Sequence, residues 1–109
     1  MVKIMVISSA KPSYDLKAVQ AAVAANNVYF QGNSTSHRDA LGYTPEEAMS
    51  CLRKLTLRNF HRCETYESQS VVADVYKLRH EHDGYIDPLY IKLRLANSAC
   101  LILSFHRER

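Results

Sequence analysis

The chain has 109 residues, 47% of them hydrophobic and 23% charged, so we expect a single domain over residues 1–109 with one hydrophobic core. Only three glycines and three prolines argue against a disordered or linker-rich chain. Fourteen Lys and Arg against eleven Asp and Glu give a net charge of +3, which is compatible with a polyanionic partner without requiring one.

The cysteines and the apolar runs indicate the compartment. The three cysteines are odd in number and lack a paired spacing, which favours reduced thiols over a disulfide framework: Cys51, Cys63 and Cys100. Residues 1–10 contain an apolar run of four, whereas a secretory signal needs about 7–15. No stretch approaches the roughly 18 apolar residues of a membrane span, so we expect a cytoplasmic protein that does not bind membranes.

The first predicted helix lies over residues 13–27. We expect Ser13 to be its N-cap, and Asp15 in the first turn favours the helix dipole. Apolar side chains recur at helical spacing and predict its buried face: Leu16, Val19, Ala22 and Val23.

A short strand and a short helix are expected next. Residues 28–30, with the sequence VYF, favour a strand. Ser34 or Thr35 can cap the short helix that follows, and Gly42 suits the left-handed position after its end.

The helix that begins after Thr44 has the strongest start signal in the chain. Thr44 is its expected N-cap, Pro45 occupies the first helical position, and Glu47 is expected to complete a capping box. Its expected core-facing side chains are Ala48, Met49, Leu52 and Leu55.

From residue 57 onward the pattern changes to that of strands. The segments rich in β-branched and aromatic residues are 57–67, 70–79, 88–95 and 100–107, with one loop marked by DG and DP pairs at 83–84 and 87–88. Helices followed by a run of strands predict an α+β fold, in which N-terminal helices pack on one face of an antiparallel sheet.

The last two strand segments alternate apolar and other side chains, which fixes the expected pairing. One face of the first segment carries Leu89, Ile91, Leu93 and Leu95, and the second carries Leu101, Leu103 and Phe105. Burying both sets on one side predicts the neighbours Leu95 with Leu101, Leu93 with Leu103, and Ile91 with Phe105. On the other face the same register predicts Arg94 beside Ile102, Lys92 beside Ser104, and Tyr90 beside His106.

That second face has two interpretations. It is a solvated sheet face, as many antiparallel sheets have, or a cationic surface that holds a phosphodiester. Arg62 and Lys77 on the preceding strands supply further cations that could reach the same face.

The segments LTLRNFHR, ADVYKLR, LYIKL and LILSFHRER, in this order, resemble the MqsR family of bacterial toxins. The earlier stretches KPSYDLKAV and SHRDALGYTPEEA are also similar to that family. The resemblance implies a RelE-like α+β fold and an endoribonuclease that needs neither metal, cofactor nor ribosome. It also implies cleavage of mRNA at GCU-type sites and an MqsA-like antitoxin as protein partner.

The resemblance also assigns roles by position in these motifs. The family's proposed catalytic lysine falls on Arg62, its strand tyrosine on Tyr90, and the basic residue after the closing S-F on His106. A family glutamine falls on Ala73, so no amide is available at that point. The expected substrate-binding side chains are His61, Lys77, Lys92 and Arg94.

These residues suit cleavage by the RNA's own 2′-hydroxyl, which needs no covalent enzyme residue. Arg62 is expected to stabilise charge on the phosphate, His106 to act as acid or base, and Tyr90 to assist it. The alternative is a non-catalytic RNA- or protein-binding module on the same fold.

Three other groups have both a functional and a structural interpretation. The HEHD segment at 80–83 could bind a metal, but without a distant partner it is interpreted as a hydrated loop, and no metal is expected. Cys63 is interpreted as a packed side chain rather than a nucleophile. The carboxylates considered as a general base, or else as surface groups, are Glu64, Glu67 and Asp74.

Overall fold

The structure, a computed structural model, describes residues 4–7, 11–66 and 71–108. Within these ranges the helices are α1 (Leu16–Ala24), α2 (Ser34–Ala40), α3 (Pro45–Arg53) and the 3-10 helix η1 (Leu57–Asn59). The strands are β1 (Ile4–Ile7), β2 (Val28–Phe30), β3 (Phe60–Tyr66), β4 (Val71–His82), β5 (Tyr85–Ala96) and β6 (Ala99–Arg107).

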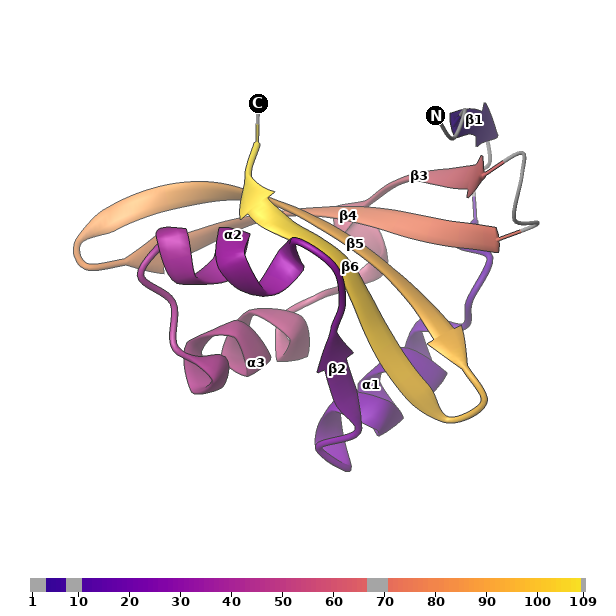
Figure 1. Ribbon diagram of the computed structural model, residues 1–109, viewed down its shortest axis with the longest axis horizontal. Helices are drawn as coiled ribbons and strands as arrows, with labels where there is room; N and C mark the ends of the chain where they lie inside the picture. Colours follow the sequence, from indigo (N-terminus) through magenta and orange to yellow (C-terminus); the bar gives the residue numbers. More distant parts are fainter. Residues whose placement is uncertain (1–3, 8–10, 67–70, 109) are drawn as a thin grey trace.

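The described strands form one sheet in the order β1-β3-β4-β5-β6-β2. Neighbours are antiparallel except β2, which runs parallel to β6 at one edge. The long hairpin of β4 and β5 crosses the middle of the sheet, and the helices lie along one side of it (Figure 1). The predicted α+β class is therefore confirmed, while β1 was not predicted.

The register of the β5–β6 hairpin follows the prediction only in part. Three predicted pairs are confirmed: Tyr90 with His106, Ile91 with Phe105, and Lys92 with Ser104. Beyond them the register shifts, and the observed pairs are Leu93 with Ile102, Arg94 with Leu101, and Leu95 with Cys100. The prediction for this half is wrong because Leu103 forms a β-bulge, which lets Ile102 enter the core in its place.

The start of α1 differs from the prediction. Asp15 is the N-cap, and its carboxylate accepts a hydrogen bond from the backbone N–H of Lys17 at 3.0 Å. Ser13 instead donates its backbone N–H to the Asp74 carboxylate at 2.9 Å, which ties the segment before α1 to β4. The predicted apolar face is confirmed for Val19, Ala22 and Val23, which are buried, while Leu16 is partly buried against the core.

The other two helix starts differ from each other in their caps. Asn33, and neither Ser34 nor Thr35, is the N-cap of α2, and its side chain makes no capping hydrogen bond. The Ser34 hydroxyl is buried and donates to the carbonyl oxygen of Ile102. Thr44 caps α3 as predicted, accepting from the backbone N–H of Glu47 at 3.1 Å. The Glu47 carboxylate does not complete the expected capping box, because it contacts two histidines of β4.

The core lies between the helices and one face of the sheet. Its largest buried side chains include Leu52 of α3 and, from the sheet, Tyr76, Leu89, Ile91, Leu93 and Phe105. Fully burying a side chain of this size contributes about 1.5–3 kcal/mol, so this face sets the orientation of the strands. Alternation then turns the intervening residues toward the opposite face, which carries the polar side chains. Among the described residues no helix is long and apolar enough to cross a membrane.

Candidate active site

The open face of the sheet holds a cavity of about 560 Å³. Strands β3 to β6 contribute most of its lining: His61, Arg62, Lys77, Tyr90, Lys92, Leu103, Ser104 and His106. Helix α2 and the segment before it add His37 and Asn33, and Glu108 lies at the C-terminal end. Six of the seven predicted site residues therefore line one cavity, and Arg94 does not.

Strand pairing explains why these side chains meet. One row across the sheet pairs Lys77 with Tyr90 and Tyr90 with His106. The next row runs from Arg62 through Val75 and Lys92 to Ser104. Directly paired residues have their Cβ atoms about 4.5–5.5 Å apart on the same face, so two adjacent rows form a compact polar patch.

The rings of Tyr90 and His106 stack. Their centroids are 4.9 Å apart and their planes differ by 7°. The Nδ1 atom of His106 lies 2.8 Å from the carbonyl oxygen of Arg107, which can only accept, so Nδ1 carries a proton. In the neutral imidazole this tautomer places the lone pair on Nε2. The ring of His37 meets His106 edge-on at 5.8 Å.

Glu64 joins the other polar side chains from beneath. It is 1% exposed, and its Oε2 accepts from Arg62 Nη2 at 2.7 Å and from the Tyr90 hydroxyl at 3.1 Å. Its Oε1 lies 2.8 Å from Lys92 Nζ. Burial raises the pKa of Glu64, but the hydrogen bonds from Lys92, Arg62 and Tyr90 outweigh it and hold the pKa below its ordinary value. The carboxylate is thus ionised at neutral pH, and the interpretation of Glu64 as a surface group is wrong.

Burial and charge also set the protonation of two cavity residues. Burial, with the nearby Lys77 and Arg62, lowers the pKa of His61, so this imidazole is mostly neutral at pH 7. Burial raises the pKa of Tyr90 despite the opposing charge of Lys92, so its phenol keeps its proton and remains a hydrogen-bond donor. Lys77 pairs with Glu108 at 2.7 Å at the rim.

Arg94 lies beyond the bulge, paired with Leu101, and is half-buried. Burial raises the pKa of the neighbouring Tyr14, and the guanidinium of Arg94 opposes that rise. Ala73, where the resemblance leads one to expect an amide, is fully buried opposite Glu64. The nearest polar group on that row is therefore a carboxylate that is already bound to cations.

A family model described as "Motility quorum-sensing regulator, toxin of MqsA" matches residues 11–107. The chain belongs to this family. It is accordingly a toxin of a toxin–antitoxin system, whose partner is an antitoxin, and the resemblance found in the sequence is confirmed. Comparison with curated proteins gives no match.

The HEHD segment of this family member is not the hydrated loop that we expected. Its two histidines belong to β4, which ends at His82, and His80 is only 3% exposed. A distant partner is also present, because Glu47 of α3 contacts both imidazoles. No local pattern predicts this contact, because Glu47 lies more than thirty residues before His80.

The remaining candidates that the structure describes are buried and have structural roles. Cys63 is 2% exposed, and burial raises the pKa of its thiol, which fits the predicted packed side chain. Asp74 is fully buried and accepts the backbone N–H groups of Ser13 and Tyr14, so it is not a surface carboxylate. Glu67 lies outside the described residues. His37 and the central role of Glu64 were both missed.

Proposed function

We propose that this toxin is an endoribonuclease that cleaves mRNA at GCU-type sites without metal or ribosome and is neutralised by an MqsA-like antitoxin. The observation that carries the proposal is the stacked Tyr90–His106 pair beside Arg62 and Lys92 in an open cavity of about 560 Å³. A cavity of this size, open to solvent and lined by cations, suits one nucleotide and its phosphate better than a buried small molecule.

The reaction begins with the 2′-hydroxyl of the RNA. In our proposal His106 Nε2 removes its proton, and the oxygen attacks the adjacent phosphorus to form a 2′,3′-cyclic phosphate. The 5′-oxygen leaves with a proton from the Tyr90 phenol, which the raised pKa keeps protonated at neutral pH. His106 then releases its proton to solvent, and solvent returns one to Tyr90, which restores the enzyme. Proton transfer of this kind contributes roughly 10²–10⁴ in rate.

Arg62 and Lys92 supply the charge that the reacting phosphate needs. The Arg62 side chain is 37% exposed and uses Nε and Nη2 to bind Glu64, while a guanidinium has five N–H donors in all. Its remaining donors are thus held in a fixed orientation by a buried carboxylate. Such preorganised donors are worth about 10²–10³ in rate each, because they need no reorganisation during the reaction.

The test is an RNA cleavage assay with purified protein and a GCU-containing RNA in excess EDTA. We expect cleavage by the wild-type protein and losses of about 10²–10³ in rate for Arg62→Ala and Tyr90→Phe. Tyr29→Phe is the matched control, because Tyr29 is 57% exposed on β2 and does not line the cavity.

The second candidate, a non-catalytic RNA-binding module, is favoured by one observation. Ala73 leaves the row beside Glu64 without an amide, and Glu64 occupies donors of Arg62, Tyr90 and Lys92. RNA binding without cleavage by the wild-type protein would contradict the nuclease and support this module. Equal rates for wild type, Arg62→Ala and Tyr90→Phe would contradict the assigned site.

A further inference from the structure

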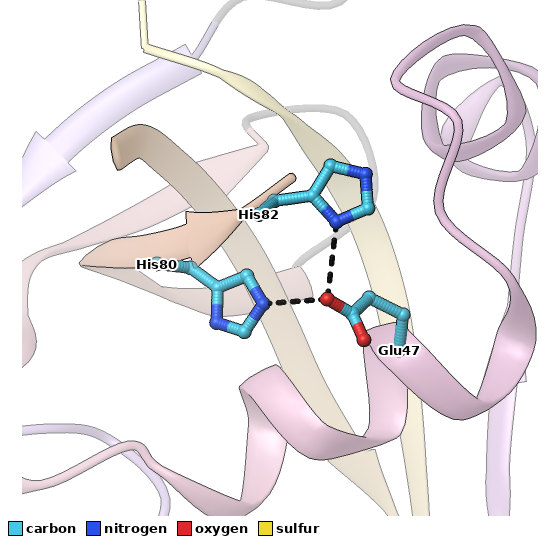
Figure 2. A group of neighbouring side chains, drawn as sticks. All are labelled: Glu47, His80 and His82. Carbon is cyan, nitrogen blue, oxygen red and sulfur yellow. Dashed lines mark hydrogen bonds and ion pairs between the residues drawn. The ribbon is translucent and has the colours of Figure 1, made fainter. Parts of the chain in front are cut away.

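A second polar cluster lies on the helix-covered face of the sheet. Figure 2 shows the carboxylate of Glu47 between the imidazoles of His80 and His82. Glu47 Oε1 is 2.9 Å from His80 Nε2 and 3.1 Å from His82 Nδ1. The candidate ligand atoms of all three residues lie within 4.8 Å of one another.

Two rigid elements hold these side chains. His80 and His82 are two residues apart on β4, so both point to the same face. Glu47 stands in the first turn of α3, which Thr44 caps and Pro45 begins. Ligands on a strand and a capped helix turn are held more firmly than ligands on a loop, as a metal site requires.

The surroundings support the same interpretation. The ring of Tyr43, which is 2% exposed, lies 4.2 Å from that of His82 and 5.7 Å from that of His80. It forms an apolar wall over the histidines. On the far side of His82, Nε2 lies 3.4 Å from the carboxylate of Asp83. Metal-bound histidines usually donate their other ring N–H to a carboxylate, and Asp83 lies near enough for that role.

From this geometry we propose that Glu47, His80 and His82 form a binding site for a divalent transition-metal ion, with Zn²⁺ the best match. Two imidazole nitrogens and one carboxylate oxygen are a donor set that proteins use for Zn²⁺, at bonds of about 2.0–2.2 Å. Ligand atoms around such a tetrahedral ion lie roughly 3.3–3.4 Å apart. The two observed contacts to Glu47 need to open only slightly. The two imidazole nitrogens lie within 4.8 Å of each other, and Glu47 is 34% exposed, so we expect a water from solvent as the fourth ligand.

The ammonium of Lys54 disfavours metal binding at His80. Its ammonium can only donate, and Nζ lies 3.1 Å from His80 Nδ1, so Nδ1 is the acceptor and the proton of the neutral ring is on Nε2. A metal bound at Nε2 requires that proton to move through solvent to Nδ1, where the ammonium then has no acceptor. Lys54 is exposed and can turn away into water, but it lowers the affinity of the site.

A bound ion would fasten α3 to the hairpin of β4 and β5 without entering the cavity on the open face. Lys77 lines that cavity, whereas His80, three residues along β4, points to the other face. The site is thus independent of the proposed nuclease, and its occupancy is expected to act on stability first. Binding only to the folded state raises the melting temperature in proportion to the logarithm of ion concentration above Kd.

The test is a calorimetric titration of tag-free protein, stripped with EDTA and dialysed, with ZnCl₂. We expect one ion per chain, a higher melting temperature, and visible absorption typical of tetrahedral coordination when Co²⁺ replaces Zn²⁺. Glu47→Gln and His82→Gln are expected to weaken binding by more than about 100-fold, beyond the usual cost of losing an outer partner. His61→Gln, a histidine on the other face, is the matched control and should bind like wild type.

A fourth variant separates a metal site from simple damage to the fold. Lys54→Gln replaces the ammonium with an amide whose oxygen can accept from His80 Nδ1–H, so we expect about 10-fold tighter binding. Structural damage would not tighten it. Wild-type protein that binds Zn²⁺ no better than Glu47→Gln, or Lys54→Gln that binds more weakly than wild type, would overturn the proposal.

Discussion

The two faces of the sheet each hold a carboxylate among basic side chains, and the partners differ. On the open face Glu64 is buried and contacts Arg62 and Lys92, which are cations at any ordinary pH. On the covered face Glu47 contacts two imidazoles, which are ligands for transition-metal ions such as Zn²⁺.

These different partners give the two carboxylates different roles. The pKa of both carboxyl groups lies below its ordinary value, but burial opposes the shift most strongly at Glu64. Glu64 is thus a buried counter-ion for two cations that line the cavity on the open face. Glu47, 34% exposed, remains reachable by an ion from solvent.

The largest expected effect tests the open face. His106→Gln keeps a polar side chain but removes the titrating ring, so we expect RNA cleavage to fall by about 10²–10⁴. Single-turnover cleavage of a GCU-containing RNA measures it. Arg107→Gln is the control at the neighbouring position, because Arg107 is exposed and pairs with Asp87 outside the cavity. Equal losses of cleavage rate in both variants would contradict a specific role for His106.

The next effect concerns stability. Lys92 is 7% exposed and pairs with the Glu64 carboxylate, which Glu64→Gln removes. Breaking a buried ion pair in this way costs about 3 kcal/mol or more. Urea unfolding at pH 7 gives the change in free energy of unfolding. Glu108→Gln makes the same chemical change at an exposed partner of Lys77 and should alter stability little. A similar change in both variants would argue against Glu64 as a buried anchor.

Lowering the pH should reduce the contributions of Glu64 and Glu47 to stability by different amounts. The folded-state pKa of Glu64 lies below the ordinary value of 4.5, so its contribution to stability is present above that pH and is lost as pH falls through the lower, folded-state pKa. Unfolding measured from pH 7 to 3 should therefore show a decline below about pH 4.5 that Glu64→Gln flattens. Glu47→Gln should flatten it less, because Glu47 is more exposed and solvent screens its contacts. The reverse order would contradict the comparison.

The smallest effect tests whether the faces are independent. Thr44→Ala removes the cap of α3, which usually costs about 1 kcal/mol, and loosens the turn that holds Glu47. Thermal unfolding should show that loss, while RNA cleavage at a temperature where the protein stays folded should be unchanged. Reduced cleavage under those conditions would mean that α3 also positions the cavity.

The hairpin shows how far local pattern determines this site. Tyr90 and His106 were expected side by side because the alternating apolar residues next to them must point into the core, and they pair as expected. The stacking of their rings was not predicted. The bulge at Leu103 was not predictable from the same pattern. Leu101, Ile102 and Leu103 are consecutive and apolar, so periodicity alone does not say which of them enters the core.

The two carboxylate clusters were missed for a different reason. Glu64 is buried only because Arg62, Lys92 and Tyr90 from two strands converge on it, and Glu47 meets His80 across a helix–sheet contact. Both depend on how distant elements pack, which the spacing of residues in one segment does not encode. Taken alone, each looked like an ordinary surface carboxylate or helix cap.

The most direct test of the nuclease uses the RNA rather than the protein. A GCU-containing RNA and the same strand with a single 2′-deoxy nucleotide at the cleaved position are incubated with wild-type toxin in EDTA. We predict that the first is cut to a 2′,3′-cyclic phosphate and a 5′-hydroxyl end and that the second is left intact at that position. Cleavage of the deoxy-substituted strand at the same bond, or no cleavage of either, would contradict the mechanism assigned to Tyr90, His106 and Arg62.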